Sequence, residues 1–151
     1  MDVELRPYQP ADWPQMCTLH DRARIDELRG SVDLAAFIPL EQAAETEGLF
    51  EGVVWVACFG ERVVGFVAAA GDEITWLYVD PDYYRRGIGR RLLRHAVAQC
   101  GPEVTTEALA GNDAAIQLYL SEGFEIVETR AGKLAGNERF PATGHFMRLT
   151  K

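Results

Sequence analysis

The residues best suited to chemistry lie between Val79 and Arg90, where an apolar stretch passes into an amphipathic one through a turn with two glycines. Gly87 and Gly89 carry no side chains, so the backbone of this turn can come close to a ligand. The helix expected to begin at Ile88 presents unpaired N–H groups and the positive end of its dipole there. The arginines that flank the turn are Arg85, Arg86, Arg90 and Arg91. These features predict an anion-binding site suited to a diphosphate.

Charge is distributed unevenly along the chain. The net charge is −8, from 15 basic and 23 acidic residues, yet five of the bases lie between Arg85 and Arg94. The strongly acidic remainder argues against nucleic acid as a partner. It either attracts a cationic substrate or serves solubility.

Length and composition favour a single domain over residues 1–151, with enough apolar residues for a core. No apolar run reaches the roughly 20 residues of a membrane helix, and the N-terminal residues do not read as a secretory signal. Cys17, Cys58 and Cys100 are odd in number and lack metal-ligand spacing. We therefore expect a reduced, cytoplasmic protein with no membrane partner and no metal.

Hydrophobic periodicity predicts a mixed α/β sheet with the order β-α-α-β-β-β-α-β-α-β-β. The expected strands are 3–6, 53–59, 62–70, 73–79, 104–109, 124–129 and 145–149. The expected helices are 11–28, 33–47 with an interruption near Pro39, 88–100 and 112–122, and 131–143 is expected to be a loop. Asp12 is the expected cap of the first helix. In strand 73–79, residues 73, 75, 77 and 79 should share one face and 74, 76 and 78 the other. Both faces are mainly apolar, which predicts a central strand covered on both sides.

Three segments carry a resemblance to a known family. Residues 77–81 (Leu-Tyr-Val-Asp-Pro) end a fourth strand in an Asp-Pro turn, and residues 86–90 (Arg-Gly-Ile-Gly-Arg) form the glycine turn. Residues 112–124 follow the pattern Asn-x-x-Ala-x-x-x-Tyr-x-x-x-Gly-Phe. In this order and spacing the chain resembles the GNAT superfamily of acyl-CoA N-acyltransferases. One position departs from the family pattern, because Tyr84 stands where Gln or Arg is usual.

The resemblance implies that coenzyme A, as acetyl-CoA, is the co-substrate. The amides of residues 85–90 would bind its pyrophosphate, and the backbone of residues 77–79 would pair with its pantetheine arm like an added strand. A bulge would separate the fourth strand from the fifth. The residues implied in binding are Leu77, Tyr78, Val79, Tyr84, Arg85, Arg86, Gly87, Ile88, Gly89, Arg90, Asn112 and Tyr119. A strand-to-helix turn that merely needs glycine is the plain alternative for the loop.

The resemblance also implies catalytic roles. The Val79 N–H would face the thioester carbonyl, where negative charge develops. Tyr119 would protonate the departing thiolate, since a phenol stays protonated at neutral pH. Glu73 matches the base of the histone-modifying branch, although many members use water. Each residue has a structural alternative: a helix cap for Asn112, core packing for Tyr119, and an edge carboxylate for Glu73.

The predicted function is acetyl transfer to a primary amine by direct attack in a ternary complex. No cysteine lies in the motifs to form an acyl-enzyme. The acceptor, a small molecule or a peptide amine, is not readable, and a homodimer is open. The alternatives are a non-catalytic CoA-binding sensor and, less favoured, a dinucleotide-binding domain.

Overall fold

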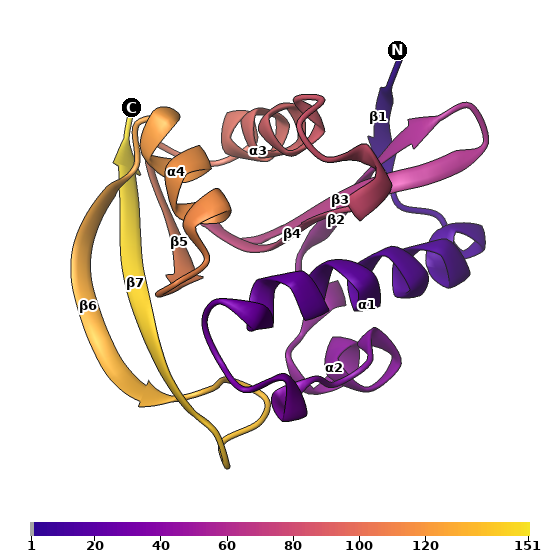
Figure 1. The fold of residues 1–151 in the computed structure, drawn as a ribbon. Helices are drawn as coiled ribbons and strands as arrows, with labels where there is room; N and C mark the ends of the chain where they lie inside the picture. The colour runs from indigo at the N-terminus through magenta and orange to yellow at the C-terminus, as the bar shows by residue number, and fades with distance from the viewer. Residues whose placement is uncertain (1) are drawn as a thin grey trace.

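A computed structural model describes residues 2–151, and these form a seven-stranded mixed sheet in the order β1-β2-β3-β4-β5-β7-β6 (Figure 1). The strands are β1 Glu4–Pro7, β2 Val53–Phe59, β3 Arg62–Ala70, β4 Glu73–Val79, β5 Glu103–Leu109, β6 Glu125–Lys133 and β7 Pro141–Thr150. The one parallel pair joins β4 to β5, across the α3 crossover. The mixed α/β class and the element order are therefore as the sequence predicts.

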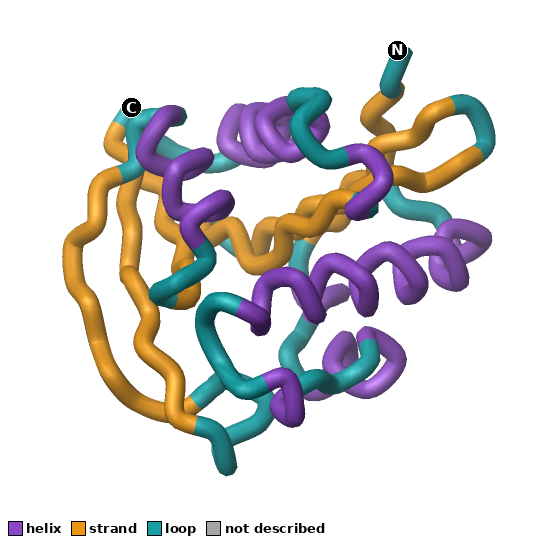
Figure 2. The backbone as a smooth tube through the Cα atoms, viewed as in Figure 1, coloured by secondary structure: helices purple, strands orange, loops and turns teal. Residues whose placement is uncertain are grey.

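Helices cover both faces of the sheet (Figures 1 and 2). The α-helices are α1 Trp13–Arg29, α2 Leu40–Thr46, α3 Ile88–Ala98 and α4 Asp113–Ser121, with short 3-10 turns η1 Pro10–Asp12, η2 Leu34–Ala36, η3 Leu49–Glu51 and η4 Pro81–Tyr83. One apolar core joins α3 and α4 to the sheet, and a second joins α1 and α2 to its other face. No helix within residues 2–151 is both long and apolar enough to cross a membrane.

The central strand β4 contains a bulge. Trp76 pairs with Ala68 and Ile74 pairs with Ala69, so Thr75 has no partner on β3. Because one extra residue reverses the alternation of faces, Ile74 joins Leu77 in the α3–α4 core, while Trp76 belongs to the α1–α2 core. The predicted faces of residues 73–79 are therefore wrong across the bulge, although the strand is covered on both sides as expected.

Strand β4 separates from β5 directly after the bulge. Parallel pairing is confined to Glu73 with Thr105 and Ile74 with Thr106. The Thr106 hydroxyl donates to the Ile74 carbonyl oxygen at 3.0 Å, at the last paired position. The expected separation of the fourth and fifth strands is thus present.

One predicted loop needs correction. The segment 131–143 is not all loop, because β6 continues to Lys133 and β7 begins at Pro141. Every residue of β6 is exposed, so this edge strand lacks the apolar alternation that reveals a strand in sequence. The expected interruption of helix 33–47 near Pro39 is present, because η2 ends before this proline and α2 begins after it.

Asp12 is used differently from the predicted cap. Its side chain makes no cap bond to α1. Instead the buried carboxylate accepts two hydrogen bonds of 2.8 Å from the Arg6 guanidinium and one of 2.8 Å from the Gln9 N–H. The hydrogen bonds from Arg6 hold the pKa of Asp12 below its usual range. This bidentate pair ties β1 to the start of α1.

We expect Asp12→Asn to lower the free energy of unfolding by roughly 2 kcal/mol at pH 7, because it removes a charge-assisted hydrogen-bonded pair. A carboxylate with a lowered folded-state pKa stabilises the fold above its unfolded pKa of about 3.9, and this contribution is lost as the pH falls further. The deficit of the variant should therefore shrink below about pH 4. Urea unfolding across pH would measure it, with exposed Asp2→Asn as control; a deficit that is constant with pH would contradict the assignment.

Candidate functional site

A cavity of about 1140 Å³ lies where β4 and β5 separate. It is lined by both strands, by α1 and α4, and by the end of the β6–β7 hairpin. The sequence-predicted residues in its lining are Leu77, Tyr78, Val79, Tyr84, Arg85, Gly87, Ile88, Gly89, Arg90, Asn112 and Tyr119. Two predicted residues, Arg86 and Glu73, are not part of the lining.

The backbone of β4 directs unpaired groups into the gap. The Asp80 N–H donates to the Val64 carbonyl oxygen at 2.8 Å, so bonding to β3 falls on alternate residues of β4. By this alternation Tyr78 bonds to β3, whereas the N–H and C=O of Leu77 and Val79 face the side of β5. Since β5 has diverged there, these groups are available to an extended ligand.

The turn between β4 and α3 is anchored by a buried carboxylate. Asp80 accepts from Arg22 at 2.9 Å and from Arg62 at 3.0 Å, and it caps η4 through the Asp82 N–H at 2.9 Å. Beyond this anchor the chain takes left-handed conformations at Arg85 (φ 62°) and Gly87 (φ 77°). No side chain caps the N-terminus of α3, so its first amides are left to solvent or to a ligand.

Four of the arginines around this turn contact other parts of the protein. Arg90 and Arg94 both pair with Glu122 of the α4 C-cap, and Arg91 donates to the Val3 carbonyl oxygen at 2.6 Å. Arg86 lies over the Tyr83 ring, 5.3 Å from its centroid. Of the arginines around this turn, only Arg85 and Arg90 line the cavity. The predicted arginine cluster is therefore divided between holding the helices together and facing the cavity.

Tyr84, the residue that departs from the family pattern, turns toward α1. Its hydroxyl donates to Asp26 at 3.2 Å, and burial together with that carboxylate raises the pKa of Tyr84. The side chain thereby links the glycine turn to the last turns of α1.

Tyr119 is buried in the α3–α4 core and lines the cavity. Its ring packs edge-on against Phe124, with centroids 5.5 Å apart. Burial raises the pKa of Tyr119 to about 12, against a lowering by its hydrogen bond with Thr106. The phenol is therefore fully protonated at neutral pH, and its core packing accompanies its place in the cavity.

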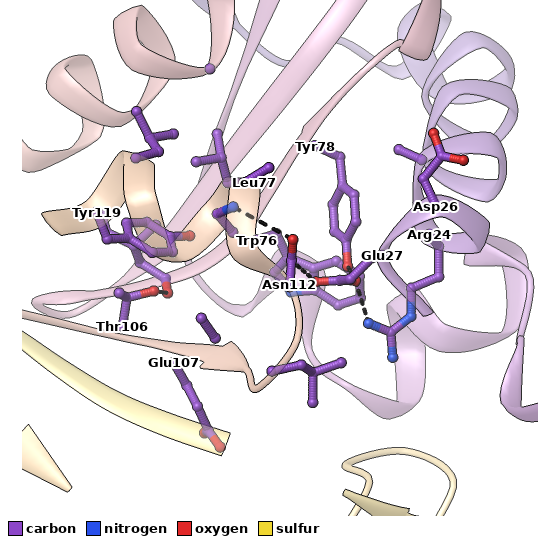
Figure 3. Close-up of a pocket in the computed structure, with 18 of the residues that line it drawn as sticks. Arg24, Asp26, Glu27, Trp76, Leu77, Tyr78, Thr106, Glu107, Asn112 and Tyr119 are labelled. Carbon is purple, nitrogen blue, oxygen red and sulfur yellow. Dashed lines mark hydrogen bonds and ion pairs between the residues drawn. The ribbon is translucent and has the colours of Figure 1, made fainter. Parts of the chain in front are cut away.

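A residue that the sequence did not indicate, Glu27, connects three elements at the cavity (Figure 3). Its carboxylate accepts from the Tyr78 hydroxyl at 2.7 Å and from the Asn112 Nδ2 at 3.1 Å, and it pairs with Arg24. Asn112 also caps α4 by accepting from the Ala115 N–H at 3.5 Å. The sequence does not indicate this network, because α1 is far from β4 and α4 along the chain.

A backbone contact also joins the end of α1 to the turn before α4. Gly111 has φ 97°, and a Cβ there would lie 1.9 Å from the Gly30 carbonyl oxygen. The end of α1 therefore touches the turn that precedes α4. Together with Glu27 and Asn112 it closes one side of the gap between β4 and β5.

A second missed carboxylate, Glu107, lines the cavity from β5. Its neighbours Thr106 and Ala108 face the α3–α4 side, so Glu107 extends to the opposite face (Figure 3). Glu73 lies where β4 and β5 are still paired, and burial raises its pKa, with a further rise from Glu107. The two carboxylates are electrostatic neighbours, but only Glu107 reaches the cavity lining. The alternation of side chains between the two faces of β5 could have indicated Glu107 from the sequence.

His20 also lines the cavity, whereas His95 and His145 do not. His20 is buried against Tyr78, with ring centroids 4.7 Å apart, and its Nδ1 lies 2.9 Å from Asp21 Oδ1. Within residues 2–151 no cluster of three or more histidine, cysteine or acidic side chains is placed to hold a metal ion.

Comparison with known proteins identifies one family. A family model described as acetyltransferase (GNAT) domain matches residues 51–126. The chain is 28% identical over 138 residues to the uncharacterised N-acetyltransferase YafP of Escherichia coli K12, covering 89% of each protein. It is 33% identical over 105 residues to the peptidyl-lysine N-acetyltransferase YjaB of Salmonella typhimurium LT2, covering 65% of this chain and 72% of that protein. The PaiA N-acetyltransferase of Thermoplasma acidophilum, solved with coenzyme A, shares the fold with a TM-score of 0.73 at 16% identity over 100% of both chains.

We expect Asn112→Asp to destabilise the protein at pH 7, although aspartate is an equally good helix cap. The new carboxylate would replace the Nδ2 donor and stand beside Glu27, so two like charges would share one site. Stability relative to wild type should recover as the pH falls and the carboxylates become protonated. Thermal melting across pH measures this, with the exposed Gln42→Glu as control for one added charge; equal melting curves at pH 7 would contradict the Glu27 contact.

Proposed function

The chain belongs to the GNAT family of acetyltransferases, and we propose that it transfers the acetyl group of acetyl-CoA to a primary amine by direct attack in a ternary complex. It is an acyl-CoA-dependent N-acyltransferase by family, and residues 1–151 are taken as one catalytic domain. The observation that carries the proposal is the opening between β4 and β5, with free backbone groups on one wall and Tyr119 on the other.

The chain's own groups fit coenzyme A. The uncapped amides of α3 and the left-handed turn at Arg85 and Gly87 suit a diphosphate, and Arg85 lines the cavity beside them. Tyr84 does not replace the phosphate contact that a glutamine or arginine would make at this position, because its hydroxyl is hydrogen-bonded to Asp26. The backbone of Leu77 and Val79 suits the amides of an extended arm. A cavity of about 1140 Å³ can hold the arm together with an acceptor.

On the sulfur side, the Val79 N–H is placed to stabilise negative charge on the thioester oxygen during attack. Tyr119 is the donor for the departing sulfur. The burial that raises the pKa of this phenol to about 12 also raises that of a thiolate beside it, so a proton can pass between them. Within the described residues no cysteine lines the cavity, which favours direct transfer over an acyl-enzyme.

On the amine side, a base must remove a proton from the acceptor. Glu107 and Glu73 are the candidates, with water as the third. We favour Glu107, because it lines the cavity and faces away from the Tyr119 side of the sheet. Attack and departure then occur on opposite faces, each with its own proton carrier.

The acceptor is proposed to be a peptide amine, because YjaB is named as a peptidyl-lysine acetyltransferase. We propose that the protein acts in the cytoplasm without nucleic acid or membrane, and homodimerisation is left to measurement. A sensor that binds CoA without turnover would have no need of a buried phenol in the cavity.

The proposed function is tested by thiol release from acetyl-CoA over a panel of amines and lysine peptides. Tyr119→Phe should lower kcat by about a hundredfold at pH 7, because the proton donor is lost. Coenzyme A affinity, measured by calorimetry, should change less than about threefold, since one hydroxyl is removed and the ring stays. Unchanged turnover would remove the acid role, and wild-type protein that binds CoA but acetylates nothing would favour the sensor.

The choice of base is tested by a matched pair of variants. Glu107→Gln should lower kcat/KM for the amine by about a hundredfold, whereas Glu73→Gln should stay within about threefold of wild type. Raising the pH should recover part of the Glu107→Gln loss, because more of the amine is then already neutral. The reverse pattern would assign the base to Glu73, and two active variants would assign it to water.

A further inference from the structure

Two polar side chains on the cavity face of α1 have no role in the reaction described above. His20 and Arg24 are four residues apart, so their Cβ atoms lie about 5–6 Å from each other on one face of the helix. Both line the cavity on the α1–α2 side of the sheet, where the amine acceptor is proposed to bind. Trp76 and Tyr78 form the apolar wall beside them.

Arg24 presents unused hydrogen-bond donors to the cavity. The pairing with Glu27 is made by Nη1, and the guanidinium also meets the Tyr78 hydroxyl. No other hydrogen-bond partner is present among residues 2–151, and the side chain is 17% exposed. Figure 3 shows the far edge of the guanidinium directed away from Glu27. An arginine held in place by one edge can offer the other edge to an oxygen of a ligand.

His20 presents an acceptor. Its Nδ1 lies 2.9 Å from Asp21 Oδ1, and the same oxygen accepts from the Leu40 N–H at 2.9 Å. A carboxylate only accepts, so Nδ1 carries the proton and Nε2 carries the lone pair. Every fully buried polar side-chain atom within residues 2–151 has a partner, and no hydrogen bond is made by Nε2, so this atom keeps some exposure on a residue that lines the cavity. Burial lowers the pKa of His20, against the effect of Asp21, which keeps the ring neutral.

We propose that His20 and Arg24 form an amide-binding subsite, so that the acceptor is an amine that also carries a peptide-type amide. Arg24 donates to the amide carbonyl oxygen, and His20 Nε2 accepts from an amide N–H of the same or the next unit. The inference rests on the proposed acetyl transfer to a peptide amine and adds the side chains that recognise the amide of that acceptor.

Charge in the cavity favours an amide over a carboxylate. Glu27 already neutralises Arg24, and Glu47 and Glu107 add negative charge to the lining. The basic groups on the β6 side are Arg130, which is paired with Glu128, and Lys133, and both lie on the exposed edge strand and not on α1. An acceptor carboxylate would meet these acids and the lone pair of His20. An amide has both a donor and an acceptor and carries no charge, so it satisfies both side chains without this repulsion.

The test compares amines with and without an amide, at saturating acetyl-CoA. The probes are L-alanine methylamide against propylamine, and Nα-acetyl-L-lysine methylamide against hexylamine. Wild-type protein should favour the amide member of at least one pair by about tenfold or more in kcat/KM calculated on the concentration of neutral amine, because an α-amino amide is less basic than an alkylamine. Arg24→Lys, which keeps the charge beside Glu27 but loses the planar edge, should reduce that ratio by about tenfold through KM.

His20→Phe keeps an aromatic ring beside Tyr78 and removes both ring nitrogens, Nε2 and the Nδ1 donor to Asp21, and it should lower amide turnover much more than alkylamine turnover. Arg29→Lys is the matched control, because Arg29 lies on the same helix and is not part of the cavity lining. Equal wild-type rates on amides and alkylamines would overturn the inference, as would variants that slow both classes alike. Preference for free alanine over its methylamide would overturn it in favour of a carboxylate. Turnover of no amine would instead overturn the proposed function.

Discussion

The structure depends on one local interruption of sheet pairing. Thr75 is an extra residue in β4, and parallel pairing with β5 ends one residue earlier, at Ile74 and Thr106. Beyond that point Leu77 and Val79 keep their backbone groups but have lost their partner strand. An unpaired buried backbone group costs about 1–3 kcal/mol. A ligand with amides of its own can form the hydrogen bonds that β5 does not form here, and this favours its binding. The bulge thus converts part of a strand ladder into a binding wall.

The gap must also be held open at a fixed width, and α1 does this from outside the sheet. Glu27 joins α1 to Tyr78 on β4 and to Asn112 before α4, which are the two sides of the gap. The carboxylate has Arg24 as its counter-charge and two further donors, so it is a partly buried group with its hydrogen bonds satisfied rather than an isolated charge. The same helix carries His20 and Arg24, which are proposed to bind the acceptor. A movement of α1 on acceptor binding would therefore change the position of β4, which is proposed to bind the cofactor.

What could be predicted from the sequence follows the range of the interactions. Periodicity found all seven strands and the helices, and short motifs found the glycine turn, Asn112 and Tyr119, because these depend on neighbours within one or two turns. The bulge at Thr75 leaves no local signature, so the faces of β4 were predicted wrongly. The end of β6 and the start of β7 were predicted as loop, because the exposed strand β6 lacks apolar alternation. The contacts of Glu27, Glu107 and His20 form only when α1, β4 and β5 come together, so the sequence did not indicate them.

The two faces of the sheet give the reaction a direction. Tyr119 belongs to the α3–α4 core, and Glu107 extends to the other face, so the proposed proton donor and proton acceptor never meet. If both lay on one face, the carboxylate could accept a hydrogen bond from the phenol, and neither group would then be available to the substrate. Separation across the strand gap leaves the thioester as the only connection between them. In the proposed reaction the amine therefore enters on the α1 side, where His20 and Arg24 are proposed to bind an amide.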